Sequence, residues 1–200
     1  MIKSEDFTVC ATICKAAEVK QSGDGTPFIT FNVKVPVQGR DESGFMTISI
    51  SADGDKNSVA YYTLDRRVTV KGALSFRKKE QNTYYNLRAE SIAIENSNVP
   101  DKLEGSLSFK GKVSKHGVQS KKDSKQNDYQ TFSAYSSDRN GDQREFIWVH
   151  FLNFKPCLED FLAANAFVEV KGDLQLGFYK GKVTHECLVR EVSEWVLEKK

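Results

Sequence analysis

Val70-Lys71-Gly72-Ala73-Leu74 occurs a second time, one hundred positions later, as Val170-Lys171-Gly172-Asp173-Leu174. Both copies have the same surroundings. A short helix-like segment precedes each, and a basic, aromatic hairpin and a last apolar strand follow each. Self-similarity at a fixed spacing indicates a repeated structural unit. The 200 residues therefore predict two copies of one small β-rich domain, each of a common domain size.

Positive and negative charges are balanced, with 29 Lys and Arg residues against 27 Asp and Glu residues. The halves are alike: residues 1–100 hold 13 basic and 12 acidic residues, and residues 101–200 hold 16 and 15. Net charge therefore indicates no particular partner, and an electropositive groove has to come from the arrangement of the cations in space.

Alternation of apolar and polar residues marks the strands of the first copy, most clearly in Phe28 to Val37 and Phe45 to Ser51. Period-two alternation is typical of half-buried strands. Further strands are expected at Phe7 to Val19, Val68 to Phe76 and Tyr84 to Ile94, with a weak helix at Asp55 to Leu64. Three strands, a helix and two strands fit a five-stranded Greek-key barrel, the OB-fold.

The second copy has the same order of elements, with strands at Leu107 to Val113, Tyr129 to Ser136, Glu145 to Leu152, Phe167 to Phe178 and Val183 to Leu197. A long loop is expected at Ser114 to Asp128, and Pro156 begins a short helix that ends at Ala166. The fold class is thus all-β with one short helix per domain. We expect OB-fold domain 1 at 1–96, a polar linker at 97–104 and OB-fold domain 2 at 105–200.

An offset of one hundred on strand three places Trp148 at the position of Ile48, and therefore in the core. Ile147, Val149 and Phe151 then face outward, and such an apolar face is costly to leave in water. We expect it to be covered by another element or subunit, as in a homodimer through domain 2, or to bind something flat.

Cations and aromatic residues recur at equivalent places in the two copies, which predicts binding of unpaired nucleic acid by stacking and phosphate contacts. In the first copy these residues are Phe28, Asn32 and Lys34 on strand two and Arg77, Lys78, Lys79, Tyr84 and Arg88 around the last hairpin. In the second copy they are Lys115, Lys121, Lys122 and Lys125 in the long loop, Tyr129 and Tyr135 on strand two, and Tyr179, Lys180 and Lys182 at the last hairpin.

Plainer explanations exist for single members of this set. A lysine-rich loop is usually only solvated, Tyr84 is equally compatible with packing on the barrel, and Phe28 follows a proline and could close the barrel end. The three histidines, His116, His150 and His185, lie on a loop and two strands without a carboxylate at ligand spacing, and no catalytic motif is present. We therefore expect no enzyme activity, metal or cofactor.

The cysteines, Cys10, Cys14, Cys157 and Cys187, form no C-x-x-C pair and are interpreted as reduced thiols. No signal peptide and no run of eighteen apolar residues is found, so a cytoplasmic protein without a membrane partner is expected.

The chain resembles bacterial and phage single-stranded-DNA-binding proteins, here as tandem OB-folds. The resemblance rests on the strand Phe28 to Val33, on Asp65 through Gly72, and on Glu145 to Val149 through Gly172. It implies stacking of DNA on aromatic residues of strands two and three, and it matches Phe151 to the family's phenylalanine at the end of strand three. The family's strand-three tryptophan position falls on Phe45 and Glu145.

Most cellular members of that family end in an acidic tail that recruits partners, whereas this sequence ends Val196-Leu197-Glu198-Lys199-Lys200. The resemblance therefore implies a phage, plasmid or other mobile-element member without a recruitment tail. The sequence predicts binding of single-stranded DNA with little sequence specificity, protecting it in DNA replication, recombination or repair. The alternative is an OB-fold protein-interaction adaptor in a replication assembly, a role that near-neutral charge suits.

Overall fold

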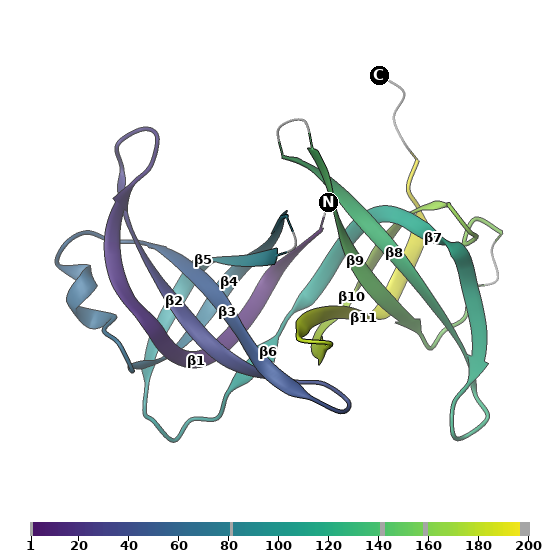
Figure 1. The fold of residues 1–200 in the computed structure, drawn as a ribbon, viewed down its shortest axis with the longest axis horizontal. Helices are drawn as coiled ribbons and strands as arrows, with labels where there is room; N and C mark the ends of the chain where they lie inside the picture. Colours follow the sequence, from purple (N-terminus) through teal and green to yellow (C-terminus); the bar gives the residue numbers. More distant parts are fainter. Residues whose placement is uncertain (1, 81, 141–142, 158–159, 197–200) are drawn as a thin grey trace.

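The structure is a computed structural model that describes residues 2–80, 82–140, 143–157 and 160–196. Strands make up most of it, grouped in two barrels that lie side by side (Figure 1). The first barrel contains β1 (Ile2–Gln21), β2 (Pro27–Gln38), β3 (Ser43–Asp53), β4 (Arg67–Lys79) and β5 (Asn82–Glu95). The short β6 (Lys102–Glu104) follows, and the second barrel contains β7 (Ser106–Lys122), β8 (Asp128–Asn140), β9 (Gln143–Asn153), β10 (Phe167–Tyr179) and β11 (Lys182–Glu194).

Each barrel closes with the same strand order. Neighbours in the first are β1-β2-β3-β5-β4, and β4 pairs back with β1. Neighbours in the second are β7-β8-β9-β11-β10, and β10 pairs back with β7. The contacts of β3 with β5 and of β9 with β11 are parallel. Two five-stranded barrels of this order confirm the all-β, OB-fold prediction.

The repeated Val-Lys-Gly motif marks a β-bulge in each barrel. The pairing of β4 with β5 shifts register between Lys71 and Gly72, and that of β10 with β11 shifts between Lys171 and Gly172. A Cβ atom on Gly72 would lie 2.0 Å from the Arg88 carbonyl oxygen, and one on Gly172 would lie 2.1 Å from the Leu188 carbonyl oxygen. The glycine recurs because a neighbouring backbone oxygen occupies the space of a side chain.

The expected helices are not formed. Between β3 and β4 only one 3-10 turn occurs, η1 (Ser58–Tyr61), without a side-chain cap. Between β9 and β10 the described residues form turns and bends, with Leu158 and Glu159 outside the described residues. Segments of about ten residues are too short to stay helical without strong packing on one face.

The strands are longer than predicted. The expected loop at 114–128 is largely a hairpin, because β7 continues to Lys122 and β8 begins at Asp128. A bulge between Val113 and Val118 interrupts the pairing, and Gly117 adopts a φ of 66° there. The polarity of this segment hid its strand character, since both sides of an extended hairpin arm can face water.

Reciprocal strand pairing joins the barrels. Ile2 and Lys3 of β1 pair with Phe109 and Ser108 of β7. The short β6, one hundred positions after the start of β1, pairs with Thr8 to Cys10 of β1. Part of the expected linker at 97–104 is therefore a paired strand, and the hydrogen-bonded sheet runs through both barrels. The domain boundaries at 96 and 105 stay a prediction.

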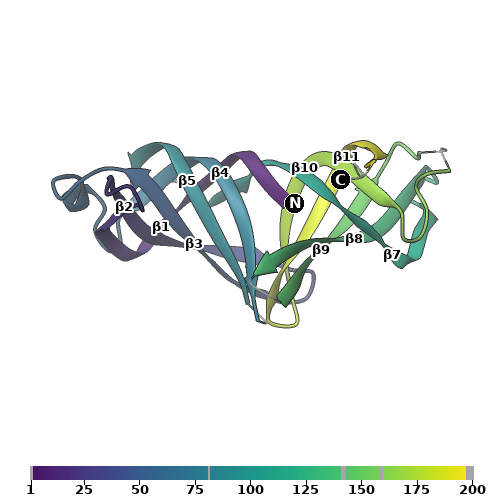
Figure 2. The ribbon, with the colours of Figure 1, turned by 90° about the horizontal axis from the view of Figure 1, so that it is seen from above.

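Reciprocal hairpin contacts form a clasp on one side of the molecule, where the hairpins of both halves converge (Figure 2). From the β4–β5 hairpin, Lys78 Nζ donates to the Phe146 carbonyl oxygen at 3.2 Å, and the Glu80 N–H donates to Glu145 Oε1 at 2.8 Å. From the β10–β11 hairpin, the N–H groups of Lys180 and Gly181 donate to the Glu42 carboxylate. Equivalent hairpins thus exchange equivalent contacts, as in a two-fold interface.

Two pairs of residues meet their own counterparts, which places them on this approximate two-fold axis. Asp6 Oδ1 accepts from the N–H and the hydroxyl of Ser106 at 2.7 and 2.6 Å. These hydrogen bonds hold the pKa of Asp6 below its ordinary value. The other pair is Tyr85 and His185, whose Oη and Nε2 atoms lie 2.9 Å apart.

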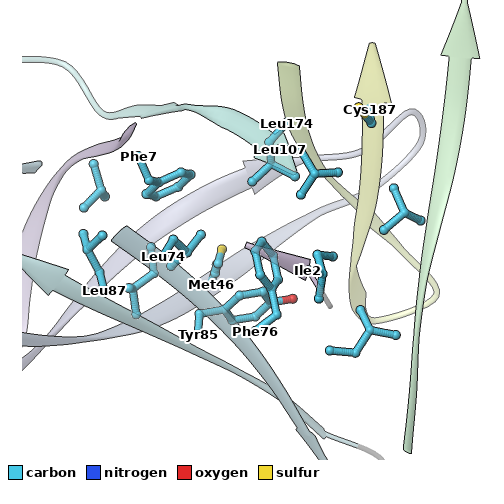
Figure 3. Packing of buried hydrophobic residues seen from close by; sticks show 14 of the residues in the cluster. Ile2, Phe7, Met46, Leu74, Phe76, Tyr85, Leu87, Leu107, Leu174 and Cys187 are labelled. Atoms are coloured by element: carbon cyan, nitrogen blue, oxygen red, sulfur yellow. The ribbon is translucent and has the colours of Figure 1, made fainter. Parts of the chain in front are cut away.

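His185 is buried at the centre of the junction. Its Nδ1 lies 3.3 Å from the Trp148 carbonyl oxygen, which can only accept, so Nδ1 carries the proton and Nε2 accepts from the Tyr85 hydroxyl. The Phe76 ring packs edge-on against both rings. Figure 3 shows Tyr85 and Phe76 beside Ile2, in a core that continues to Leu107 and Leu174 of the second half.

We predict that acid weakens this junction. Burial lowers the pKa of His185 from an ordinary 6.5 to about 4. The unfolded chain therefore takes up a proton that the folded chain refuses, so stability falls as the pH drops from about 6.5 to about 4, by about 3 kcal/mol in total. Urea unfolding at a series of pH values measures this loss.

Two glutamine variants separate this histidine from other acid effects. His185→Gln should be less stable at neutral pH but flatter between pH 6.5 and 4, because glutamine does not titrate. His116→Gln removes an exposed histidine and should keep the wild-type profile. Identical profiles for wild type and His185→Gln would show that His185 is not the titrating group.

Candidate nucleic-acid interface

A groove of about 1130 Å³, here called the junction groove, lies between the barrels beside the clasp. Its floor comes from the outer faces of β3 and β9, and its walls come from the β4–β5 and β10–β11 hairpins. The side chains that carry its chemistry are rings and cations, namely Phe45, Tyr84, Phe146, Trp148, Tyr179, Lys78, Lys180 and Lys182.

A second groove of about 770 Å³, the arm groove, continues across β8 and β9 toward the β7–β8 hairpin arm. It shares Ser133, Trp148 and His150 with the junction groove, so the two form one path. Lys115, Lys121 and Tyr135 also line it. The path is therefore longer than either barrel face alone.

Charge is sorted along this path despite the balanced composition. Five lysines line the two grooves, and no Asp or Glu is among the described residues that line them. The acidic residues lie elsewhere and often hold cations in ion pairs, as Asp53 holds Arg88 and Asp173 holds Arg190. Because like charges gather along a concave surface, the field there favours an anionic ligand.

The register of β9 differs from the one expected, and Trp148 faces the grooves. Its side chain is 50% exposed, whereas Ile147 and Val149 are buried. Phe132 pairs with Phe151 and Tyr135 with Trp148, just as Phe31 pairs with Ile50 and Lys34 with Thr47 in the first barrel. The correct offset on strand three is therefore 101, the same as on strand two. A slip of one residue moves every side chain to the other face of a strand.

Two predictions fail with that slip. Phe151 is 0% exposed and packs between Phe109 and Phe132 at centroid distances of 5.0 and 4.8 Å, so it cannot contact a ligand. Ile147, Val149 and Phe151 form no outer apolar face, which removes the basis for the expected homodimer. The sequence held a signal: strand two aligns at an offset of 101, and the same offset on strand three places Ile147, Val149 and Phe151 at the positions of the apolar Met46, Ile48 and Ile50.

Trp148 belongs to a cluster of three rings on β8 and β9. The Tyr135 ring centroid lies 4.9 Å from that of Trp148 and 5.2 Å from that of Phe146. Tyr135 is half-buried, while the other two rings are exposed. Neighbouring contact holds each ring in place and leaves a face toward solvent, as base stacking requires.

The structure brings nine of the predicted ligand residues to the grooves: Asn32, Lys78, Tyr84, Lys115, Lys121, Tyr135, Tyr179, Lys180 and Lys182. Lys34 stands at the rim, with Nζ 4.2 Å from the centroid of the Phe45 ring. Phe28, Arg77, Lys79, Arg88, Lys122, Lys125 and Tyr129 do not line either groove. Sequence reasoning missed Phe45, Phe146, Trp148, Ser133 and His150 as groove residues.

Tyr129 and its surroundings have another role. Its ring stacks on Phe154 at a centroid distance of 5.4 Å, and the nearby Lys122 pairs with Asp128. Phe28 is half-buried at the end of the β1–β2 hairpin. These residues lie on the hairpin arms, away from the junction groove, so their contact with a ligand stays a prediction.

The two strand histidines, His150 and His185, each contact a polar partner. His185 is buried in the junction, whereas His150 faces the grooves, with Nδ1 3.3 Å from the Ser133 hydroxyl. Burial lowers the pKa of His150, so it is neutral near pH 7.

In the described part of the chain no three His, Cys, Asp or Glu side chains are grouped to hold a metal ion. None of its helices is long and apolar enough to cross a membrane.

Some solved structures have a fold similar to that of this chain. No family model and no curated protein matches the sequence. Among solved structures, a deletion mutant of the single-stranded DNA binding protein from Thermus aquaticus matches with a TM-score of 0.54 and 11% identity, over 99% of this chain and 97% of that chain. The wild-type protein matches with a TM-score of 0.51 and 10% identity, over 99% and 96%. The chain has the fold of these proteins. The match covers both barrels together.

We predict different effects on stability for aspartate substitutions at two neighbouring positions of β9. Val149→Asp puts a charge at a side chain that is 1% exposed, so it should destabilise the protein by about 4 kcal/mol or more. Trp148→Asp changes an exposed residue and should leave the urea midpoint within a few tenths of a molar. If Trp148→Asp were the variant that unfolds, the register described here would be wrong.

Proposed function

We propose that the protein binds single-stranded DNA along the junction and arm grooves, with bases stacked on exposed rings and phosphates held by lysines. One observation carries the proposal: the described lining of both grooves has five lysines, several exposed rings and no carboxylate, in a chain whose charges are otherwise balanced. Rings beside cations match the two chemical parts of an unpaired strand.

The ring geometry favours single strands over duplexes. Phe146, Trp148 and Tyr135 present their surfaces within a concave path, where an unpaired base can reach them. Bases in a duplex are already stacked on one another, so their faces are not available. The likeness to the Thermus aquaticus single-stranded DNA binding protein supports the same ligand class.

Low sequence specificity follows from this mode of contact. Every base has a stacking face, and lysines bind phosphates that are the same at every position. A protein of this kind covers exposed strands, and we infer a protective role in DNA replication, recombination or repair. Binding without catalysis is proposed, because the rings and lysines of the grooves provide stacking surfaces and phosphate contacts.

A protein-interaction adaptor remains the second candidate, since the exposed rings of the junction groove could also hold a peptide segment. The absence of acidic residues from the described groove lining would then select an acidic peptide. The two candidates differ in their response to oligonucleotides.

We predict tight, salt-sensitive binding to an unstructured oligonucleotide. If each of the five groove lysines neutralises one phosphate, log K should fall with log salt at a slope of about −3.5, because each phosphate on a single strand contributes about 0.7. Fluorescence anisotropy of labelled oligo(dT) at several salt concentrations measures the slope. No binding to oligo(dT) would favour the adaptor, and equal affinity for duplex DNA would contradict stacking.

The position of the lysines should affect the salt dependence of binding more than their number does. Lys180→Ala with Lys182→Ala removes two groove cations and should make the salt slope shallower by about 1.4. Arg77→Ala with Lys79→Ala removes two exposed cations of the β4–β5 hairpin outside the grooves, and it should change the slope by less than half as much. Equal effects of the two double variants would mean that the strand follows another path.

A further inference from the structure

We propose that the two barrels bind one strand unequally: the ring cluster on β8 and β9 of the second barrel is the main site of base stacking, and the equivalent face of the first barrel, on β2 and β3, stacks bases weakly. This inference rests on the proposed function and specifies where in the grooves the bases stack. Residues that occupy the same positions in the two barrels differ in their chemistry.

Equivalent positions on the groove faces carry different chemistry. Strand pairing makes Lys34 the counterpart of Tyr135, Thr47 the counterpart of Trp148, and Phe45 the counterpart of Phe146. The second barrel therefore has three rings where the first has a lysine, a threonine and one ring. Stacking surface is concentrated on one side of the junction.

Phe45, the ring at these positions of the first barrel, is partly covered by its neighbour. Lys34 Nζ lies 4.2 Å from the centroid of the Phe45 ring, so a cation covers one face of that ring. On the second barrel Tyr135 contacts both Trp148 and Phe146, which are 50% and 40% exposed, so the three rings form a larger continuous surface than Phe45, which is 62% exposed. A base meets a ring cluster on β8 and β9 and a lysine-covered ring on β2 and β3.

The approximate two-fold relation gives a physical reason for this unequal stacking. A strand that follows the junction groove from one barrel to the other meets the two barrel faces in opposite senses, because a two-fold axis reverses direction. A DNA strand has a chemical direction, so two identical stacking sites could not both receive it in the same way. Phosphate contacts from flexible lysines depend less on direction.

Trp148 provides the measurement. The chain has two tryptophans, Trp148 in the grooves and Trp195, which packs edge-on against Phe167. In a Trp195→Phe background the fluorescence reports on Trp148 alone. We expect a short oligo(dT), long enough for one barrel at about four to eight nucleotides, to quench this fluorescence on binding.

Matched substitutions test the unequal stacking. Trp148→Ala should weaken binding of the short oligonucleotide by about 5- to 150-fold, and Trp148→Phe should restore most of it. Thr47→Ala, at the counterpart position, should change affinity less than twofold. Tyr135→Ala should weaken binding at every salt concentration, whereas Lys34→Ala should mainly make the salt slope of a longer oligonucleotide shallower.

Equal losses from Trp148→Ala and Thr47→Ala, or binding of the short oligonucleotide without quenching, would overturn this inference while leaving single-stranded DNA binding intact. Anisotropy of the labelled oligonucleotide separates failure of this inference from failure of DNA binding, because it detects binding wherever the strand lies. If anisotropy shows no binding by the wild-type chain, the proposed function itself fails. Thermal melting of each variant controls for loss of fold.

Discussion

The hydrogen bond between Tyr85 and His185 lies at a buried place where the two barrels meet at equivalent positions. His185 has to be neutral there, since its Nε2 accepts from the tyrosine while Nδ1 donates to the Trp148 carbonyl oxygen. The same contact ties the backbone of β9 to the junction, so the strand that carries the exposed tryptophan is fixed by a buried polar pair. Buried polar groups of this kind are tolerated only when each has a partner.

The junction creates the junction groove. Neither barrel forms it alone, because its floor and walls come from strands and hairpins of both. The carboxylates of Glu42 and Glu145 hold the backbone N–H groups of the opposite hairpins, and those hairpins present Tyr84, Tyr179 and the lysines to the groove. Both of these carboxylates are thus engaged with backbone groups of the clasp.

The barrels have kept one scaffold and changed its groove face. The bulge at Gly72 and Gly172 and the closing pairs of strands recur, since both depend on backbone geometry. Several outward positions of strands two and three differ, as Thr47 and Trp148 do, because a solvent-facing side chain is not constrained by barrel closure. Copies of one fold can therefore differ most where a ligand binds.

The sequence by itself determined the two-copy organisation, the strand order and the absence of a net charge that would indicate a partner. Those features follow from composition, local alternation, turn residues and a five-residue motif that recurs with four of its residues unchanged, which short segments express without help from the rest of the chain. Of the eighteen ligand residues that the sequence predicts, nine line the grooves. Only the tertiary structure decided which face of β9 carries Trp148. The repeated motif recurs at an offset of 100 and strand three at an offset of 101, and a difference of one residue moves every side chain to the other face of a strand. The meeting of the two hairpins across the junction was likewise decided by tertiary packing, since it joins residues up to 139 positions apart that no local pattern connects.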